Sequence, residues 1–116
     1  CSFKKRFSFT KRTEESTRIL KKYSDKIPII VTKGSNCELP DIDKNKFLVP
    51  AEITLAQFMY VIRKRIDLSS EEAIFLFLNN NTLAATSTTL GSLYLEHKDK
   101  DGFLYLVYCN ENVFGN

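Results

Sequence analysis

The sequence is poor in the residues that build metal sites and disulfide scaffolds. It has three cysteines, Cys1, Cys37 and Cys109, with no CxxC pair, and it has one histidine. An odd cysteine count and so little histidine argue against a disulfide framework and against a zinc site. We therefore expect free thiols, no metal and no cofactor. His97 has no acid, serine or cysteine spaced to partner it, so we expect no catalytic residue and no enzyme.

Long apolar segments are also missing. No run approaches the ~20 apolar residues that cross a bilayer, and no basic stretch followed by an apolar one resembles a signal peptide. The chain has 116 residues, of which 43% are hydrophobic and 27% charged. This length and composition suit a single soluble globular domain. We expect it to reside in the cytosol or the nucleus.

Positive charge is concentrated at the start of the chain. Residues 1–26 hold nine Lys or Arg and three Asp or Glu, whereas the remainder is net negative and the total is +3. A basic head of this kind steers a protein towards an acidic partner, an anionic membrane or nucleic acid, and it is equally explained as a solvated helix face. Phenylalanines lie among these basic residues, but no recognised RNA-binding motif accompanies them. We therefore do not expect a nucleic-acid partner.

Hydrophobic periodicity and composition predict the elements of the fold. Helical spacing indicates two helical pieces over 3–23, a long helix over 55–66 after the capping box Thr54-x-x-Gln57, and a short helix near residues 90–94. Short apolar runs predict strands over 27–31, 46–50, 73–78 and 103–108. The first and last strands are the most apolar, so we expect them side by side at the centre. The prediction is an α+β fold, a β-grasp (ubiquitin-like) mixed four-stranded sheet with a two-helix N-terminal extension.

The stretch Lys46-Phe47-Leu48-Val49-Pro50 suggests a function. Proline cannot donate to a ladder, so Pro50 predicts that this strand lies at the edge of the sheet. A free edge lets an extended peptide from another protein add a strand. Because side chains alternate along a strand, Lys46 and Leu48 should face one side while Phe47 and Val49 face the other. Lys46 is otherwise explained as an edge-protecting lysine, and its apolar neighbours as core residues.

Several blocks of the sequence, in the same order, resemble the autophagy ubiquitin-like modifiers of the GABARAP and light-chain-3 family. The motifs are closest to those of the GABARAP branch, and the resemblance runs from about residue 7 to the C-terminus. Two departures are Ser24, where proline is usual, and the segment 79–86, which lacks the usual prolines. The blocks that carry the resemblance are 21–31 (KKYSDKIPIIV), 43–50 (DKNKFLVP), 62–66 (IRKRI), 101–105 (DGFLY) and 114–115 (FG).

This resemblance implies two pockets beside the edge strand, which receive the aromatic and the aliphatic residue of a short interacting motif. Some basic residues, namely Arg12, Lys46 and Arg65, are then expected to meet acidic residues of the motif. The aromatic pocket would be formed by Glu15, Ile19, Pro28, Lys46, Leu48 and Phe103. The aliphatic pocket would be formed by Phe47, Val49, Pro50, Leu55, Phe58, Val61 and Arg65.

The resemblance also implies a conjugation site at Phe114-Gly115-Asn116. A processing cysteine protease would remove Asn116, and activating and conjugating enzymes would join the freed Gly115 carboxylate to phosphatidylethanolamine. The protein would then move from the cytoplasm to autophagosomal or other vesicle membranes, where it would recruit receptors and machinery. Residues 1–26 would form an N-terminal helical extension, 27–109 the ubiquitin-like body and 110–116 a flexible tail. The alternative is a ubiquitin-like adaptor that binds peptides or the cytoskeleton without conjugation.

Overall fold

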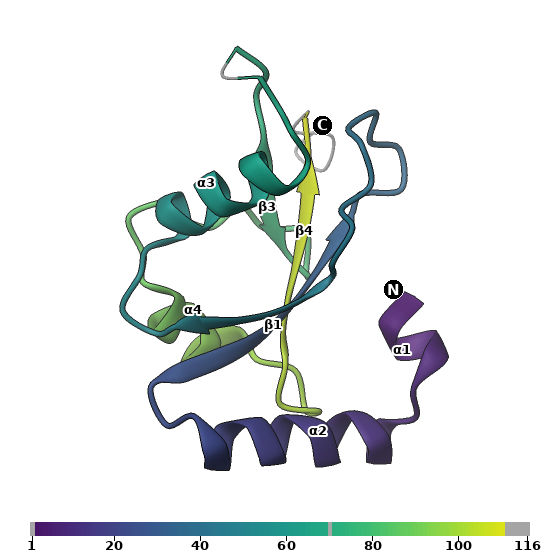
Figure 1. The fold of residues 1–116 in the computed structure, drawn as a ribbon, viewed down its shortest axis with the longest axis vertical. Helices are drawn as coiled ribbons and strands as arrows, with labels where there is room; N and C mark the ends of the chain where they lie inside the picture. The colour runs from purple at the N-terminus through teal and green to yellow at the C-terminus, as the bar shows by residue number, and fades with distance from the viewer. Residues whose placement is uncertain (1, 70, 111–116) are drawn as a thin grey trace.

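The computed structural model describes residues 2–69 and 71–110. Within these ranges the element order is the predicted one, with two helices before the first strand (Figure 1). The helices are α1 (Ser2–Arg6), α2 (Phe9–Lys22), α3 (Leu55–Arg65) and α4 (Leu90–His97). The strands are β1 (Lys26–Lys33), β2 (Lys46–Pro50), β3 (Phe75–Leu78) and β4 (Leu104–Cys109).

The four strands form one mixed sheet in the order β2-β1-β4-β3. β1 is antiparallel to β2 and parallel to β4, and β3 is antiparallel to β4. The first and last strands therefore lie together at the centre, as their apolar composition predicted. Ile29, Ile30 and Val31 are fully buried, because a central strand covered on both faces needs apolar side chains on both. The predicted ubiquitin-like α+β architecture is confirmed.

Each of the three longer helices begins at a hydroxyl side chain that caps a backbone N–H group. Ser8 precedes α2, Thr54 precedes α3 and Thr89 precedes α4, and each accepts a hydrogen bond from the N–H three residues on. At α3 the Gln57 side chain also accepts from the Thr54 N–H, which completes the capping box. These caps satisfy amides that the first turn of a helix leaves without an intrahelical partner.

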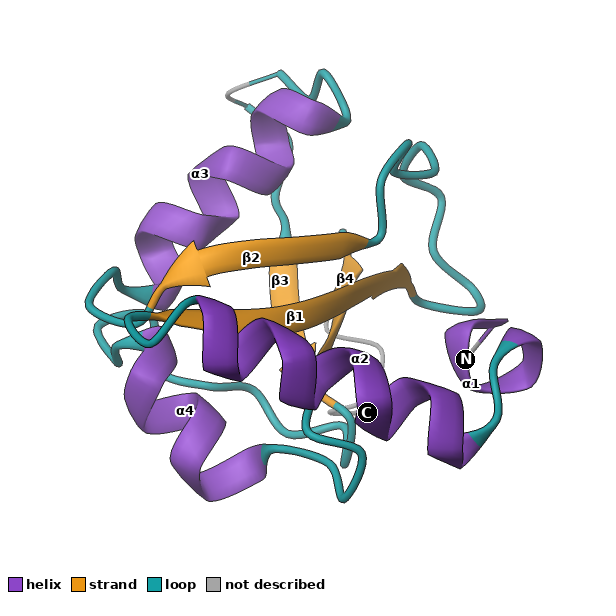
Figure 2. Cartoon of the chain, turned by 60° about the horizontal axis from the view of Figure 1, so that its bottom comes forward, coloured by secondary structure: helices purple, strands orange, loops and turns teal. Residues whose placement is uncertain are grey.

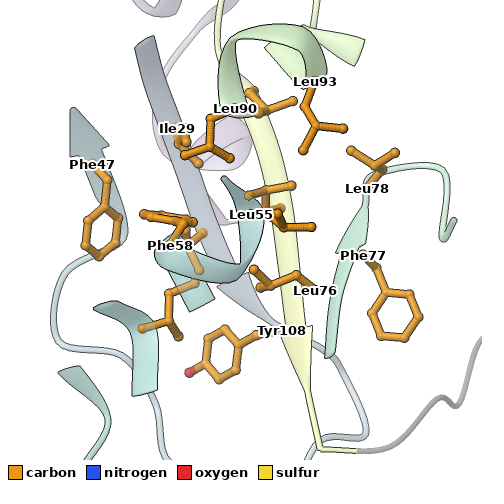
Figure 3. Packing of buried hydrophobic residues seen from close by; sticks show 14 of the residues in the cluster. Ile29, Phe47, Leu55, Phe58, Leu76, Phe77, Leu78, Leu90, Leu93 and Tyr108 are labelled. Atoms are coloured by element: carbon orange, nitrogen blue, oxygen red, sulfur yellow. The ribbon is translucent and has the colours of Figure 1, made fainter. Parts of the chain in front are cut away.

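The helices α3 and α4 cover one face of the sheet, which we call the front face. Alternate residues of β1, including Ile29, join α3 and α4 in one buried apolar cluster (Figure 3). On the β2 side of this cluster the rings of Phe47 and Phe58 meet edge to face with centroids 5.4 Å apart. This cluster is the main core of the molecule.

The two N-terminal helices lie on the opposite, back face, where α2 crosses the sheet (Figure 2). A second, smaller cluster of buried residues forms there from Phe3, Ile30, Phe103 and Tyr105. The Phe3 ring lies 5.2 Å from Phe103 and 6.4 Å from Tyr105, measured between centroids. Phe3 therefore packs on the sheet, whereas Phe7 and Phe9 are 37% and 51% exposed.

Boundaries of three strands differ from the prediction. β1 runs over Lys26–Lys33 and not 27–31, and β4 ends at Cys109 and not at residue 108. β3 begins at Phe75 and not at residue 73, because its ladder with β4 starts at the pair Phe75 and Cys109. β4 begins at Leu104, one residue later than predicted, because the N–H of Phe103 donates to the Asp101 side chain in the preceding turn. None of the helices described is both long and apolar enough to span a bilayer.

Candidate functional site

The β2 strand forms an open edge of the sheet. It pairs with β1 on one side, and no other strand of residues 2–69 and 71–110 lies along its outer side. Pro50 ends this strand, where its missing N–H leaves no gap in the ladder. The prediction of an edge strand at 46–50 is confirmed.

The ladder shows which backbone groups this edge offers. The Val31 N–H donates to the carbonyl of Asn45 over 2.8 Å, so this is a hydrogen-bonded pair. Bonded and non-bonded pairs alternate in an antiparallel ladder, so Phe47 also bonds inward to β1. The N–H and C=O groups of Lys46 and Leu48 therefore point outward. They are the donors and acceptors that a visiting strand would use.

Side chains of β2 alternate between the two faces as predicted. Phe47 and Val49 point into the front core and are 6% and 7% exposed. Lys46 and Leu48 face the back and are half-buried. The edge therefore presents a basic and an apolar side chain next to α2, together with the outward backbone groups.

Lys46 is held between the two N-terminal helices. Its ammonium group forms an ion pair with Glu15 of α2, and it lies over the Phe3 ring of α1 at 5.9 Å from the centroid. The Lys46 side chain is still 43% exposed. The charge is therefore positioned by the extension, and part of the side chain stays exposed to solvent.

The residues predicted for the aromatic pocket meet on the back face. Ile19 packs against the small back cluster, while Pro28 is buried opposite Leu48 in the ladder. Phe103 is fully buried beneath Phe3, which the prediction did not include. Phe3 is one of the phenylalanines among the basic residues, and nothing in the sequence indicated which surface it would cover.

The residues predicted for the aliphatic pocket divide into two groups. Val61 and Arg65 of α3 are exposed and Pro50 is half-buried, so these three can line an opening. The Arg65 guanidinium also lies 3.3 Å from the Asp43 carboxylate. The other four belong to the front core and could provide only the floor of a pocket. They are Phe47, Val49, Leu55 and Phe58, each 7% exposed or less.

Arg12 does not lie where the prediction placed it. It is only 9% exposed, and its Nε lies 3.0 Å from a carboxylate oxygen of the fully buried Asp101. Its guanidinium also donates to the carbonyl of Phe7. The guanidinium is turned towards an internal acid, because burying one charge requires a counter-charge. Arg12 is therefore a structural residue here and not a surface contact for acidic partners.

Asp101 is the centre of the polar contacts that fasten the extension to the body. Its side chain accepts hydrogen bonds from the Phe103 N–H over 2.9 Å and from the Tyr105 hydroxyl over 2.5 Å. Its backbone carbonyl accepts from the Ser16 hydroxyl of α2 over 2.5 Å. Burial and the neighbouring Asp101 carboxylate raise the pKa of Tyr105 well above its ordinary value.

A second contact from the same connection holds α1. The Lys4 ammonium lies 2.7 Å from the Asp99 carboxylate. Burial raises the pKa of Asp99, but the hydrogen bonds from Lys4 and from the Asp101 N–H outweigh burial, so the pKa lies below its ordinary value. The connection between α4 and β4 therefore anchors both N-terminal helices.

Comparison with known proteins identifies the family. The family model described as "Autophagy protein Atg8 ubiquitin like" matches residues 11–115. The chain belongs to the Atg8 family. It is 52% identical to Autophagy-related protein 8 of Kluyveromyces lactis, over 99% of this chain and 92% of that protein. It is 53% identical to Autophagy-related protein 8B of rice (Oryza sativa subsp. indica), over 98% of this chain and 95% of that protein.

A solved structure supports the same assignment. The crystal structure of Trypanosoma brucei ATG8 matches with a TM-score of 0.90 and 35% sequence identity, covering 96% of this chain and 95% of that one. Membership of the Atg8 family makes the chain a ubiquitin-like protein of autophagy and not an enzyme. The resemblance to autophagy ubiquitin-like modifiers is confirmed at the level of the family.

The conjugation residues of this Atg8 chain stay a prediction from sequence. Phe114, Gly115 and Asn116 lie outside the described residues. The Atg8 family match includes residue 115. The last described residue, Asn110, follows directly after β4, one of the two central strands of the sheet.

Proposed function

We propose that this chain is a lipid-conjugated modifier that recruits autophagy receptors and machinery through short aromatic-x-x-aliphatic motifs. Such a motif would add a strand along β2, while its two apolar side chains occupy the pockets predicted on either side. The observation that supports this most directly is the outward direction of the N–H and C=O groups of Lys46 and Leu48. Backbone pairing gives such a ligand its register, and the flanking side chains select its sequence.

The charge at this edge favours an acidic ligand. Lys46 and Arg65 carry exposed cationic groups on opposite faces of the edge, with side chains 43% and 39% exposed. Glu15 and Asp43 already pair with them, so an acidic peptide would have to compete for both cations. We therefore expect acidic residues before the motif to speed association and to make affinity sensitive to salt.

A peptide titration tests the docking step. An acidic peptide with an aromatic-x-x-leucine core should bind the wild-type chain, and Lys46→Ala or Leu48→Ala should each weaken binding by about tenfold. Lys100→Ala, which removes an exposed lysine of the turn between α4 and β4, is the matched control and should not change the affinity. Calorimetry or fluorescence anisotropy measures the dissociation constants.

Backbone methylation of the peptide distinguishes strand addition from side-chain docking alone. An N-methyl group on the peptide amide that donates to the Leu48 carbonyl removes a donor and keeps every side chain, so it should weaken binding strongly. Methylation of an amide that points away from β2 should have little effect. Equal binding of all these peptides, or indifference to both substitutions, would refute docking at this edge.

The conjugation step has a separate test. Incubation with the Atg8-processing cysteine protease should remove the mass of Asn116, and the product should become membrane-bound after reaction with the conjugation enzymes. Glycine suits this position because it has no Cβ to obstruct an enzyme. Gly115→Ala should therefore prevent conjugation. If the membrane-bound fraction in cells is the same with Gly115→Ala, the alternative of an unconjugated adaptor is favoured.

A further inference from the structure

Two cysteines from distant parts of the sequence come together at one end of the sheet. β1 and β4 are parallel neighbours, and the N–H of Gly34, just after β1, donates to the carbonyl of Tyr108 over 2.9 Å. The chain then turns, with the N–H of Cys37 donating to the carbonyl of Gly34 over 3.1 Å. This turn brings Cys37 back towards Cys109, the last residue of β4.

The side chains of these two cysteines share one small space. Both Sγ atoms donate to the same oxygen, Oδ1 of Asn110, from 3.8 Å for Cys37 and 3.6 Å for Cys109. A Cβ placed on Gly34 would lie 3.7 Å from the Cβ of Cys37 and 3.6 Å from that of Cys109. Because residue 34 has no side chain, nothing from Gly34 separates the two thiols.

The two thiols are buried, and Cys37 lies in a segment through which an oxidant can reach it. Both thiols are free, with Cys109 fully buried and Cys37 9% exposed. Burial and the Cys109 side chain raise the pKa of the Cys37 thiol, so Cys37 is protonated at neutral pH. Cys37 lies in the irregular segment between β1 and β2, which can open locally at a lower free energy than the sheet. Cys37 is therefore the thiol that an oxidant meets first.

We propose that Cys37 and Cys109 are an oxidisable dithiol that closes to a disulfide and locks the segment 34–45 to the end of β4. The oxidant is a low-molecular-weight disulfide such as oxidised glutathione. The Cys37 thiolate attacks it, a mixed disulfide forms and one glutathione leaves as its thiol. The Cys109 thiolate then attacks the Cys37 sulfur and releases the second glutathione. The protein loses two protons and two electrons, and one oxidised glutathione becomes two reduced ones.

The length of the loop that the disulfide closes and its distance from Gly115 indicate how it affects the protein. A cross-link between Cys37 and Cys109 closes a long loop, so it should stabilise the fold by restricting the unfolded chain. It lies six residues before Gly115. Six extended residues span about 20 Å, so the tail keeps most of its reach. The lock therefore acts on the stability of the body, and cleavage after Gly115 should proceed in both redox states.

The test equilibrates full-length Cys1→Ser protein with glutathione redox buffers and quenches it with acid. The oxidised protein should lose the mass of two hydrogens, and non-reducing tryptic digestion should give peptide 34–44 linked to peptide 101–116. The Tm should rise by ~10 °C and return after reduction with dithiothreitol. Cys37→Ser in the same background should abolish both the linked peptide and the rise in Tm.

Two further results decide the case. The native fold holds the two thiols together, so the disulfide should form more readily in the native protein than in the chain in guanidinium chloride. Half-oxidation of the native protein should therefore occur in a buffer at least tenfold more reducing. Equal ratios, stable glutathione adducts in place of the linked peptide, or oxidation that lowers the Tm would each overturn the proposal. Cys109→Ser changes a fully buried residue, so the far-ultraviolet circular dichroism of that variant is recorded beside its redox titration.

Discussion

The two faces of the sheet are covered by helices that are attached in different ways. On the front, α3 and α4 enclose one continuous apolar cluster. On the back, α1 and α2 rest on four buried residues and on polar contacts around Asp101. Hydrophobic stabilisation scales with the apolar area buried, at about 25 cal/mol per Å². We therefore expect the front layer to carry most of the folding free energy, and the back layer to be a unit of lower stability that can detach while the body stays folded.

The strongest test of this comparison removes a side chain from the front core. Phe58→Ala deletes a ring that is fully buried against Phe47, and it should lower the free energy of unfolding by about 3–5 kcal/mol. Denaturant unfolding measures the loss, and exchange protection should fall throughout the sheet. Tyr60→Ala on the same helix, where the side chain is 59% exposed, is the control and should cost about 0.5 kcal/mol or less.

A smaller effect is expected from the polar anchor of the back layer. Asp101→Asn leaves the buried Arg12 without its counter-charge, and it should cost about 3 kcal/mol. Hydrogen exchange should show α2 losing protection before α3. The pKa of Tyr105 should also fall, because the Asp101 carboxylate is one of the causes that raise it.

A double variant checks the cause of this effect. Arg12→Leu combined with Asp101→Asn removes both charges, so it should recover part of the stability that the single change loses. Asp99→Asn affects a more exposed ion pair with Lys4 and should have a smaller effect. Equal losses in α2 and α3 after Asp101→Asn would contradict the separation of the two layers.

The smallest loss of global stability is expected at α1. Phe3→Ala removes a buried ring, but α1 can detach alone, so the body should lose only about 1–2 kcal/mol. Amide exchange in α1 should rise, with little change in β1 or β4. Phe7→Ala, at a ring that is 37% exposed, is the matched control. If Phe3→Ala destabilises the sheet as much as Phe58→Ala, the two layers are one cooperative unit.

The same division separates what the sequence could predict from what it could not. The helix α3 and its capping box are local patterns, because apolar spacing and the pair Thr54 and Gln57 lie within one segment. The edge position of β2 followed from Pro50 for the same reason. Residues within a single segment were therefore enough to predict that β2 is the edge strand with free backbone groups.

The contacts between the N-terminal helices and the sheet leave no local pattern in the sequence. Arg12 looks like any exposed residue of a basic helix, and its partner Asp101 looks like part of a turn, because an ion pair between distant segments leaves no periodic pattern. The family resemblance implied a surface role for Arg12, and no pattern in the sequence pointed to Asp101 as its partner. The position of Phe3 against Phe103 likewise depends on how the helices fold back onto the sheet.

The short length of β2 also limits self-association of the protein. Unpaired sheet borders readily recruit identical copies and grow into fibres. Here the border is five residues long, begins with a lysine and ends with a proline. A second copy that paired there in parallel would bring two Lys46 charges close together, and in either direction it would gain few hydrogen bonds. The edge of β2 therefore suits transient binding of a short acidic peptide and disfavours the growth of fibres.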